Sequence, residues 1–193
     1  MPLSVIILAA GQSSRMGQIK QLMPFRQSTV LGEVINNFLL SAVSEIILVL
    51  GHRAEEVMKT IASKPTKIVI NPDYRRGMST SIIAGLNHVD TQTRAVMLAL
   101  GDQPLIGSLT INRLIRAFYR HDRGIIIPTY RGKRGHPIIF AIKYKEELLK
   151  LKGDVGGRQI IKDHPNDVLS VEVASESVVV DFDTKNDYQA HVG

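Results

Sequence analysis

The chain has 193 residues, 44% of them hydrophobic and 22% charged, and it contains no cysteine. These values are typical of one globular domain that buries about 70% of the surface of its unfolded chain. The absence of cysteine excludes disulfides, thiolate metal sites and cysteine nucleophiles. No apolar stretch approaches the roughly 20 residues that span a bilayer, and no signal peptide is recognisable. We therefore expect a cytoplasmic protein with a single domain over residues 1–193 and no membrane partner.

The formal net charge of +6 raises the question of a nucleic-acid partner. Basic residues gather at Arg75–Arg76 and at Arg131–Arg134. Aromatic residues, however, make up only 5% of the chain and do not alternate with the basic residues as stacking platforms for bases would. A basic solvated surface and a site for anionic substrates account for the charge, so we expect no nucleic-acid partner.

Apolar runs and amphipathic stretches alternate along the chain as far as Pro128. The apolar runs predict strands at Val5–Leu8, Ile46–Leu50, Lys67–Ile70, Ala95–Leu100 and Gly124–Pro128. The amphipathic stretches predict helices at Val30–Ser41, Ala54–Ala62, Ser79–Val89 and Leu109–Tyr119. Strands that alternate with helices in this way are typical of an α/β protein with a parallel sheet covered on both faces.

Beyond Pro128 the regular alternation of apolar runs and amphipathic stretches ends. The pattern predicts strands at Pro137–Phe140, Leu169–Val173 and Ser177–Phe182, and helices at Lys143–Leu151 and Arg158–Lys162. We interpret this half as completing the same domain with a mixed sheet. It would then supply the side of the site that binds a second substrate, while the N-terminal half binds the first.

A loop of small residues follows directly on the first predicted strand and holds Gly11, Ser13, Ser14, Arg15 and Lys20. A buried parallel strand that leads into a glycine loop presents backbone N–H groups to a phosphate, and the cationic side chains add charge. The glycine spacing fits neither a Walker A motif nor a dinucleotide fingerprint, which argues against a dehydrogenase. We predict that Arg15 and Lys20 hold the phosphates, with Ser13 and Ser14 as possible further donors.

Asp102 follows the fourth predicted strand, between Gly101 and Pro104. The carboxyl ends of parallel strands meet at one edge of an open sheet, which is where ligands bind. We therefore expect Asp102 to lie close to the glycine loop. Mg²⁺ prefers oxygen ligands and takes only one or two carboxylates from the protein, so Asp102 is the best candidate for a magnesium ligand. The alternative is a turn-forming aspartate with no ligand.

Taken together, these motifs resemble those of the nucleotidyltransferases related to molybdenum cofactor cytidylyltransferase and its guanylyltransferase counterpart. The first motif is Leu-Ala-Ala-Gly-x-Ser-x-Arg-Met-Gly-x-x-Lys at residues 8–20. Further matches, in the right order, lie at residues 71–79 (Asn-Pro-Asp-Tyr-Arg-Arg-Gly-Met-Ser), 100–104 (Leu-Gly-Asp-Gln-Pro), 134–137 (Arg-Gly-His-Pro), 153–158 (Gly-Asp-Val-Gly-Gly-Arg) and 181–184 (Asp-Phe-Asp-Thr). The resemblance spans essentially the whole chain.

The resemblance implies a three-layer, Rossmann-like fold of the nucleotide-diphospho-sugar transferase type, with a mostly parallel, mixed sheet. It implies a magnesium-dependent transfer of CMP from CTP to the terminal phosphate of a molybdopterin-type cofactor, with release of pyrophosphate. Arg15, Lys20 and Asp102 would be the catalytic residues, since positioning and electrostatics supply most of such a reaction. A molybdoenzyme or its maturation factors are possible protein partners.

The second magnesium ligand is expected near the C-terminus. Of Asp181 and Asp183, only one is expected to face the site. The related enzymes carry an Asp or Asn at the position of Asp183, directly before the threonine, which makes Asp183 our choice and Asp181 the fallback. The alternative role for Thr184 is purely structural, as the N-cap of the closing helix.

The resemblance also assigns the second substrate to the loops around residues 134–137 and 153–158. Arg134, His136, Pro137 and Arg158 are the residues expected to contact it, and Gly135 permits a close backbone approach. Gln103 could reach either the base or the acceptor.

Base recognition is expected from the backbone of Leu8, Ala9 and Ala10, where small side chains leave room for a base. The Ala-Ala-Gly form resembles the cytidylyltransferase branch, whereas guanylyltransferases more often read Ala-Gly-Gly. Cytosine is thus favoured over guanine. The alternatives are GTP as the nucleotide, a sugar phosphate as the acceptor, or a non-catalytic accessory protein for molybdoenzyme maturation.

Overall fold

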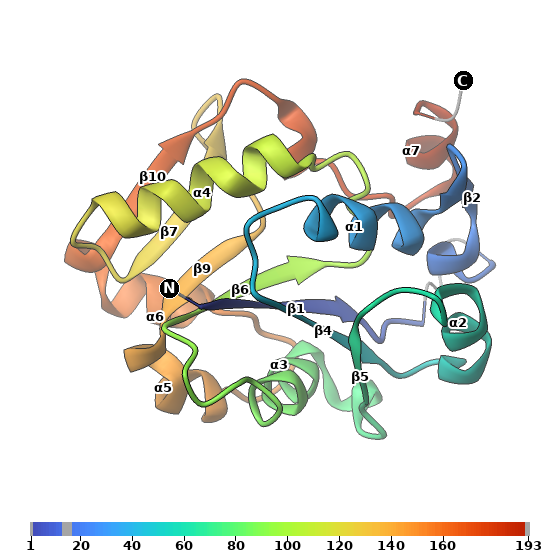
Figure 1. Cartoon of the computed structure of the whole chain (residues 1–193), viewed down its shortest axis with the longest axis horizontal. Coiled ribbons are helices and arrows are strands. Elements are labelled where there is room, and N and C mark those ends of the chain that lie inside the picture. The colour runs from blue at the N-terminus through green and yellow to red at the C-terminus, as the bar shows by residue number, and fades with distance from the viewer. Residues whose placement is uncertain (1, 13–16, 192–193) are drawn as a thin grey trace.

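The structure is a computed structural model that describes residues 2–12 and 17–191. Its strands, shown in Figure 1, are β1 (Leu3–Ala9), β2 (Pro24–Phe25), β3 (Ser28–Thr29), β4 (Glu45–Leu50), β5 (Lys67–Ile70), β6 (Ala95–Leu100), β7 (Ile125–Tyr130), β8 (Lys133–Arg134), β9 (Ile138–Ala141) and β10 (Val168–Glu172). In the described residues, the main sheet has eight strands in the order β10-β7-β9-β6-β1-β4-β5, with β8 paired to β7. Only β8 and β9 run antiparallel to their neighbours in it, so the predicted α/β fold with a mixed, mostly parallel sheet is confirmed.

The α-helices of the described chain are α1 (Val30–Leu39), α2 (Ala54–Ile61), α3 (Met78–Leu86), α4 (Ser108–Arg120), α5 (Lys145–Leu149), α6 (Arg158–Asp163) and α7 (Lys185–Gln189). Short 3₁₀ turns occupy Lys20–Leu22, Tyr74–Arg76, Ile142–Tyr144, Pro165–Asp167 and Glu176–Val179. Every helix and strand predicted as far as Phe140 is present, with ends shifted by a few residues, as is usual for frayed termini. None of the described helices is both long and apolar enough to cross a membrane.

Side chains of the central strands alternate between two apolar layers, because successive residues of a strand point to opposite faces. In β1, Val5 and Ile7 pack with α1, α2 and α4, whereas Ile6 packs with α3, α5 and α6. The helices therefore cover both faces of the sheet and give three layers (Figure 1). Burial on both faces explains why the central strands read as continuous apolar runs.

The strand predicted at Ser177–Phe182 is wrong. Its first residues lie in the 3₁₀ turn Glu176–Val179, and the chain then continues without pairing to the sheet. The N–H of His136 donates to the carbonyl of Val178 over 2.9 Å, and the N–H of Phe182 donates to the carbonyl of Asp102 over 3.1 Å, so isolated loop contacts hold this segment in place of a strand ladder. Val180 and Phe182 pack into a separate apolar cluster without belonging to a strand.

That separate cluster fastens the C-terminal segment to the start of the chain. Phe182 is fully buried against Met23, Phe25 and Val30, and its ring lies edge-on to that of Phe25 with the centroids 5.4 Å apart. The hydroxyl of Tyr188 donates to the carbonyl of Pro24 over 2.5 Å. Burial of a phenylalanine of this size contributes roughly 1.5–3 kcal/mol, so the segment that carries Asp181 and Asp183 is held firmly in place.

Asp167 joins β10 to the segment before α5, and we expect it to make folding sensitive to acid. Burial alone would raise its pKa, but Lys143, the hydroxyl of Tyr144 and the N–H of Gly124 hold the pKa at about 2. A carboxyl whose pKa is lower in the folded than in the unfolded chain stabilises the fold above the unfolded value, and this stability is lost as the pH falls from about 4 to 2.

Asp167→Asn should therefore lower the free energy of unfolding at pH 7 by about 1 kcal/mol, since solvent screens part of the interaction. Urea unfolding of both proteins between pH 2 and pH 7 measures this, and the difference should shrink towards pH 2. A difference that stays constant with pH would show that Asp167 acts only through packing.

Candidate active site

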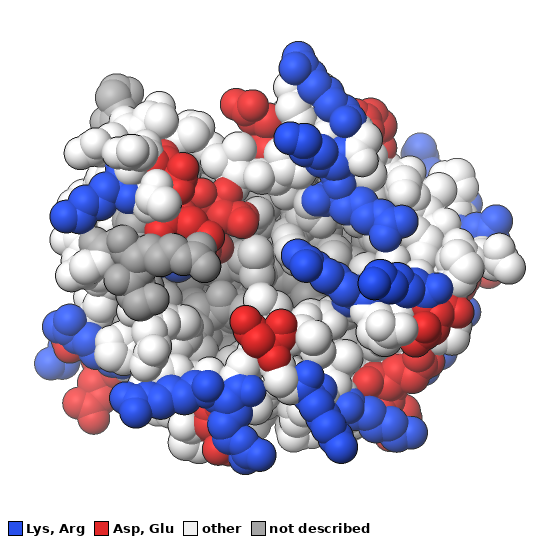
Figure 2. Space-filling view, turned by 180° about the vertical axis from the view of Figure 1, so that it is seen from behind, with Lys and Arg blue, Asp and Glu red and all other residues white. Residues whose placement is uncertain are grey.

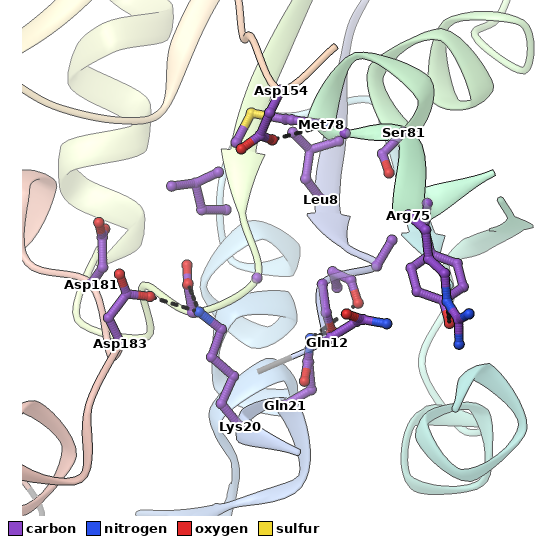
Figure 3. Close-up of a pocket in the computed structure, with 18 of the residues that line it drawn as sticks. Leu8, Gln12, Lys20, Gln21, Arg75, Met78, Ser81, Asp154, Asp181 and Asp183 are labelled. Atoms are coloured by element: carbon purple, nitrogen blue, oxygen red, sulfur yellow. Dashed lines mark hydrogen bonds and ion pairs between the residues drawn. The ribbon is translucent and has the colours of Figure 1, made fainter. Parts of the chain in front are cut away.

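A cavity of about 650 Å³ opens at the carboxyl ends of β1, β5 and β6 (Figure 3). Its lining residues come from the loops after these strands, from the turn after the glycine loop and from the C-terminal segment: Leu8 to Gln12, Lys20, Gln21, Tyr74 to Met78, Ser81, Leu100 to Asp102, Asp154, Asp181 and Asp183. The cavity lies where the parallel topology predicted a ligand site.

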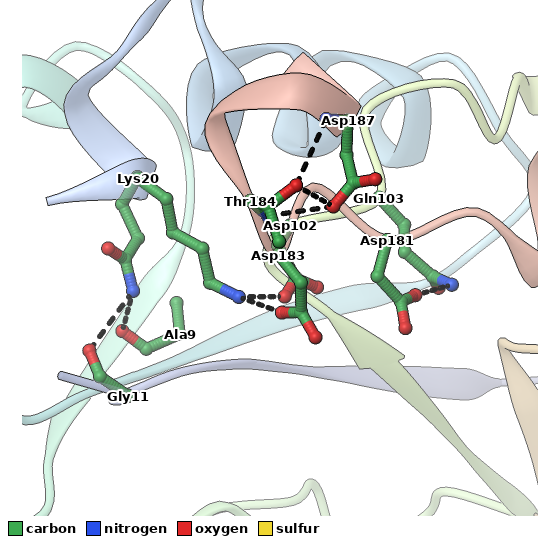
Figure 4. Close-up of polar contacts among 10 residues, drawn as sticks. Ala9, Gly11, Lys20, Asp102, Gln103, Asp181, Asp183, Thr184 and Asp187 are labelled. Carbon is green, nitrogen blue, oxygen red and sulfur yellow. Dashed lines mark hydrogen bonds and ion pairs between the residues drawn. The ribbon is translucent and has the colours of Figure 1, made fainter. Parts of the chain in front are cut away.

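Lys20 is the centre of this site. Its ammonium group donates to Oδ2 of Asp102 and, over 3.0 Å, to Oδ1 of Asp183 (Figure 4). The side chains of Lys20 and Asp102 are each 14% exposed. Burial lowers the pKa of Lys20, but the two carboxylates outweigh it and raise the pKa above its ordinary value, so the ammonium stays charged. The predicted phosphate ligand and both predicted metal ligands are therefore brought together, with Lys20 neutralising the carboxylates.

Asp183 reaches Asp102 because the residue between the two C-terminal aspartates is anchored. The backbone N–H of Phe182 donates to the carbonyl of Asp102 over 3.1 Å. Thr184, directly after Asp183, forms a capping box with Asp187 and starts α7, as the capping alternative expected. Two structural anchors thus fix the backbone on either side of Asp183.

The donor set fits a magnesium ion. Oδ1 of Asp102 is buried and accepts no hydrogen bond from any described residue, and an unpaired buried carboxylate oxygen is costly unless a cation or donor satisfies it. The described residues hold no group of three or more His, Cys, Asp or Glu side chains suited to a metal. Mg²⁺ usually binds through one or two carboxylates and completes its shell with water and substrate phosphates, so Asp102 and Asp183 suffice.

Asp181 lies beside the pair but has a different partner. It accepts a hydrogen bond of 2.5 Å from the amide of Gln103 (Figure 4), and burial together with the charges of Asp102 and Asp183 raises its pKa. The prediction that only one C-terminal aspartate could face the site is wrong, because both line the cavity. Residues two positions apart share one face even in a strand, so strand periodicity gives no reason to separate the two aspartates. Gln103, whose role was open, orients Asp181 through this hydrogen bond.

Gln21 is a site residue that the sequence analysis missed. Its side chain is buried at 3% exposure, and its amide nitrogen donates to the carbonyl of Ala9 over 3.2 Å and to that of Gly11 over 3.4 Å (Figure 3). The carbonyls of Leu8 and Ala10 accept from the N–H groups of Gly101 and His52. The backbone of residues 8–11, which is expected to recognise the base, is therefore held in one conformation by the side chain of Gln21 and by the N–H groups of Gly101 and His52.

Replacing Gln21 should disturb that backbone. In Gln21→Leu the buried carbonyl of Ala9 and the carbonyl of Gly11 lose this donor, which costs about 1–3 kcal/mol of stability. We expect the KM for the nucleotide to rise about tenfold while kcat changes much less. Steady-state kinetics and thermal unfolding of the same samples measure both effects. Gln21→Met, equally long but without a donor, should match Gln21→Leu. An unchanged KM in both variants would show that Gln21 serves stability alone.

The turn before α3 forms another wall of the cavity. Tyr74, Arg75 and Arg76 line it, and the guanidinium of Arg75 lies 5.8 Å from the centre of the Tyr74 ring. Sequence analysis quoted this segment as a family motif but gave it no role. The signal was present, since a basic pair directly before a glycine follows a predicted strand that ends at the ligand edge.

Gly77 lets this turn meet the loop around residue 153. Its φ is +111°, and a Cβ there would lie 2.4 Å from the carbonyl carbon of Gly153. Across this contact the N–H of Ser79 donates to the carbonyl of Gly153 over 3.2 Å, and that of Met78 donates to Asp154 over 3.1 Å. The contact brings Asp154 into the cavity wall.

The residues expected to bind the acceptor lie outside this lining. Arg134 is exposed on β8, Pro137 is buried, and Arg158 is exposed at the start of α6. His136 is half-buried; burial lowers its pKa, nearby Asp102 raises it, and Arg158 lowers it further. Of the two loops expected to bind the acceptor, the 153–158 loop contributes a described residue, Asp154, to the lining of the cavity.

Three of the predicted phosphate-binding residues, Ser13, Ser14 and Arg15, lie outside the described residues. Leu8, Ala9, Ala10, Gly11 and Lys20 line the cavity as predicted. Figure 2 shows that one face of the molecule is hollowed, with acidic side chains close to the hollow and Lys and Arg side chains spread around it. A surface of this kind suits an anionic ligand that also brings a metal ion.

Comparison with known proteins gives these features a common context. Residues 5–168 match the family described as "MobA-like NTP transferase domain". The chain belongs to this MobA-like nucleotidyltransferase family. The match covers both the glycine loop and Asp102, the two features around which the cavity is built.

Two full-length relatives carry different names. The chain is 36% identical over 186 residues to the molybdenum cofactor cytidylyltransferase of Escherichia coli K12, covering 95% of this chain and 92% of the relative. It is 30% identical over 188 residues to the nicotine blue oxidoreductase of Paenarthrobacter nicotinovorans, covering 93% and 91%. Membership of the MobA-like family therefore does not by itself fix the substrates.

Solved structures confirm the fold of this MobA-like chain. Rv0371c of Mycobacterium tuberculosis H37Rv superposes with a TM-score of 0.88 at 32% identity, over 99% of this chain and 97% of that one. The same protein has been solved in complex with manganese, with a TM-score of 0.84 at 30% identity and the same coverage. A CMP-2-keto-3-deoxy-manno-octonic acid synthetase complexed with CTP has a TM-score of 0.80 at 12% identity, over 98% and 96%, and shows the shared fold alone.

Proposed function

We propose that this protein is a magnesium-dependent cytidylyltransferase that transfers CMP from CTP to the terminal phosphate of a molybdopterin-type cofactor and releases pyrophosphate. The observation that carries the proposal is the joint placement of Lys20, Asp102 and Asp183 at one end of a cavity that begins at the glycine loop. The cytidylyltransferase named among the relatives supports the choice of substrates.

Nucleotidyl transfer needs no protein nucleophile. An oxygen of the acceptor phosphate forms a bond to the α-phosphorus of CTP, the bond to the bridging oxygen breaks, and pyrophosphate leaves with the electron pair. Catalysis consists mainly of positioning and of neutralising charge. Asp102 and Asp183 would hold the metal ion, which supplies charge to the triphosphate when bound.

Lys20 exchanges partners in this scheme. Its ammonium already lies between the two carboxylates, and a lysine side chain is long and flexible enough to turn towards a phosphate oxygen. A cation that takes its place on Asp102 and Asp183 would free Lys20 for the leaving pyrophosphate. Arg15 would grip the same phosphates in a bidentate way.

Small side chains support cytosine as the base. Ala9 and Ala10 line the cavity next to Gly11, and Gly51 lies so close to Ala10 and Tyr74 that a Cβ there would come within 2.7 Å of the Tyr74 side chain. Close packing of Gly51 therefore fixes the position of Ala10 and Tyr74 in the wall of the cavity. The Ala-Ala-Gly sequence supports the same choice.

The acceptor would enter from the side of the site that carries Asp102. His136 interacts electrostatically with Asp102 and Arg158, and basic groups of this kind suit a phosphorylated small molecule. We assign Arg134, His136, Pro137 and Arg158 to the acceptor path, where they would complete the binding site once the acceptor is bound.

The deciding experiment measures pyrophosphate release by the purified protein with Mg²⁺ and molybdenum cofactor, comparing CTP with GTP. Release with CTP that depends on the cofactor and disappears in Asp102→Asn is the expected result. Release with GTP alone would overturn the base, and release with a sugar phosphate alone would overturn the acceptor. No release with any combination would leave a non-catalytic accessory protein, and reduction of nicotine blue with a nicotinamide cofactor would instead indicate an oxidoreductase.

A further inference from the structure

A second cavity, of about 410 Å³, lies between α4 and β10 and shares no residue with the candidate active site. One wall carries Arg113, Arg116, Arg120 and His121, and the other is formed by residues 169–172 of β10. We call this cavity the α4–β10 groove. Figure 1 shows α4 lying along β7 and β10 on one face of the sheet.

The arginines of the groove form one cationic row. Positions 113, 116 and 120 are spaced by three and four residues, so the side chains share one face of the helix. All three are exposed, and no hydrogen bond or ion pair joins any of them to another described residue. Among the described residues, Glu172 acts on this row through the charge of Arg113, and a row of three guanidinium groups with one acid beside it favours an anionic partner.

Glu172, the acidic residue that lines the described groove, already has hydrogen-bond partners in the protein. Glu172 accepts hydrogen bonds from the hydroxyl of Thr129 over 2.6 Å and from the N–H of Arg131 over 2.7 Å. These bonds, with the charge of Arg113, lower the pKa of Glu172 below its ordinary value. Glu172 therefore stays bound to the β7 side and leaves the arginines open to a partner.

The other wall is the edge of the main sheet. β10 pairs with β7 on one side only, so its outer N–H and C=O groups are available to an added strand. Leu169 and Val171 are half-buried and pack beneath α4, which gives apolar contacts to the same face. An extended peptide can add to such an edge through backbone hydrogen bonds.

We propose that the α4–β10 groove binds an extended acidic segment of a partner protein, which adds to β10 as a strand and places carboxylates on Arg113, Arg116 and Arg120. The spacing agrees, since side chains on one face of a strand repeat every 6.6 Å or so and positions 116 and 120 are about 6 Å apart along the helix axis. The partner should therefore carry acidic residues at alternate positions.

The groove chemistry favours a peptide over a nucleic acid. No aromatic residue lines the described groove, whereas single-stranded nucleic acids are bound through stacking on aromatic side chains as well as through charge. Arginines beside an edge strand can also serve simply to prevent aggregation of that edge. The experiment has to separate these three roles.

The probe is a fluorescein-labelled peptide of ten residues in which Glu and Val alternate, added to the full chain and followed by fluorescence anisotropy. We expect saturable binding that weakens with salt and that falls at least tenfold in Arg113→Glu/Arg116→Glu. Lys150→Glu/Lys162→Glu, which makes the same charge change at exposed positions of the opposite layer, should bind as the unaltered protein does. Hydrogen exchange should show that the peptide protects amides of residues 168–172.

Control probes distinguish binding of an added strand from a general polyanion site and from simple protection of the sheet edge. A peptide of equal charge with two central prolines cannot add as a strand, so equal binding of that peptide would overturn the proposal. Equal binding of a ten-nucleotide oligo(dT) would replace it with a general polyanion site. No binding, with self-association of Arg113→Glu/Arg116→Glu in sedimentation, would show that the arginines only protect the edge.

Because the groove is separate from the candidate active site, the double variant should keep its pyrophosphate release, and failure of the proposed function would not affect this test.

Discussion

Asp102→Asn is expected to lower kcat for pyrophosphate release by about 10²–10³-fold while the Kd for CTP changes by less than about threefold. The substitution keeps the shape of the side chain but removes the negative charge. Oδ1 of Asp102 is the buried oxygen that accepts no hydrogen bond from the described residues, so the lost charge is the one best placed to hold a metal ion. The phosphates, by contrast, are bound by cations that the substitution leaves in place.

Rapid-quench kinetics for kcat and calorimetry for nucleotide binding measure the two quantities on one preparation. Asp163→Asn is the matched control, because Asp163 is exposed and bonds only Gln159 among the described residues, and it should behave as the unaltered protein. A kcat for Asp102→Asn within threefold of normal would exclude Asp102 as the metal ligand. A full restoration of kcat by high Mg²⁺ would show that the loss lies in metal affinity rather than in the chemical step.

Lys20→Met is expected to move metal binding and turnover in opposite directions. Without the ammonium group, Asp102 and Asp183 lose the cation that they share, and two carboxylates close together attract a divalent ion more strongly. We expect Mn²⁺ to bind the nucleotide-free protein about tenfold more tightly. The kcat should fall by about 10²–10³-fold, because no lysine remains to stabilise the departing pyrophosphate.

Mn²⁺ binding can be followed by electron paramagnetic resonance without any turnover, which keeps the two effects separate. Lys20→Arg preserves the positive charge, so its Mn²⁺ affinity should stay close to that of the unaltered protein even if its kcat falls. Weaker Mn²⁺ binding in Lys20→Met would mean that the lysine helps to shape the metal site. In that case the proposal that Lys20 leaves the two carboxylates to bind a phosphate would be wrong.

Local sequence patterns predicted most of the fold because the central strands are buried on both faces. Ile46–Leu50 and Ala95–Leu100 are continuous apolar runs in the sequence. Their parallel pairing with β1 follows from the helices that connect the strands. The same reasoning failed at Ser177–Phe182, where the apolar residues satisfy a separate cluster around Phe182 instead of a strand. An apolar pattern reports burial, but it does not identify the surface against which a residue is buried.

The candidate site was predictable where a residue follows a strand. Lys20 and Asp102 belong to loops at the carboxyl edge, and strand order alone brings those loops together. Gln21 was missed because a buried glutamine that holds backbone carbonyls has no sequence signature of its own. Asp181 and Asp183 were singled out as alternatives, whereas both line the cavity. Their different partners, Gln103 and Lys20, lie far away in the sequence.

The sequence by itself determined the class of protein, the order of its strands and helices, and the loop that begins the site, because each depends on neighbouring residues and on periodic burial. Only the tertiary structure decided that Lys20 lies between Asp102 and Asp183, which are 82 and 163 positions away along the chain. Contacts of that range arise from the packing of Phe182 and from the edge that β1 and β6 share. They carry no local signal, since each side chain acquires its partner only after the segments between them have folded.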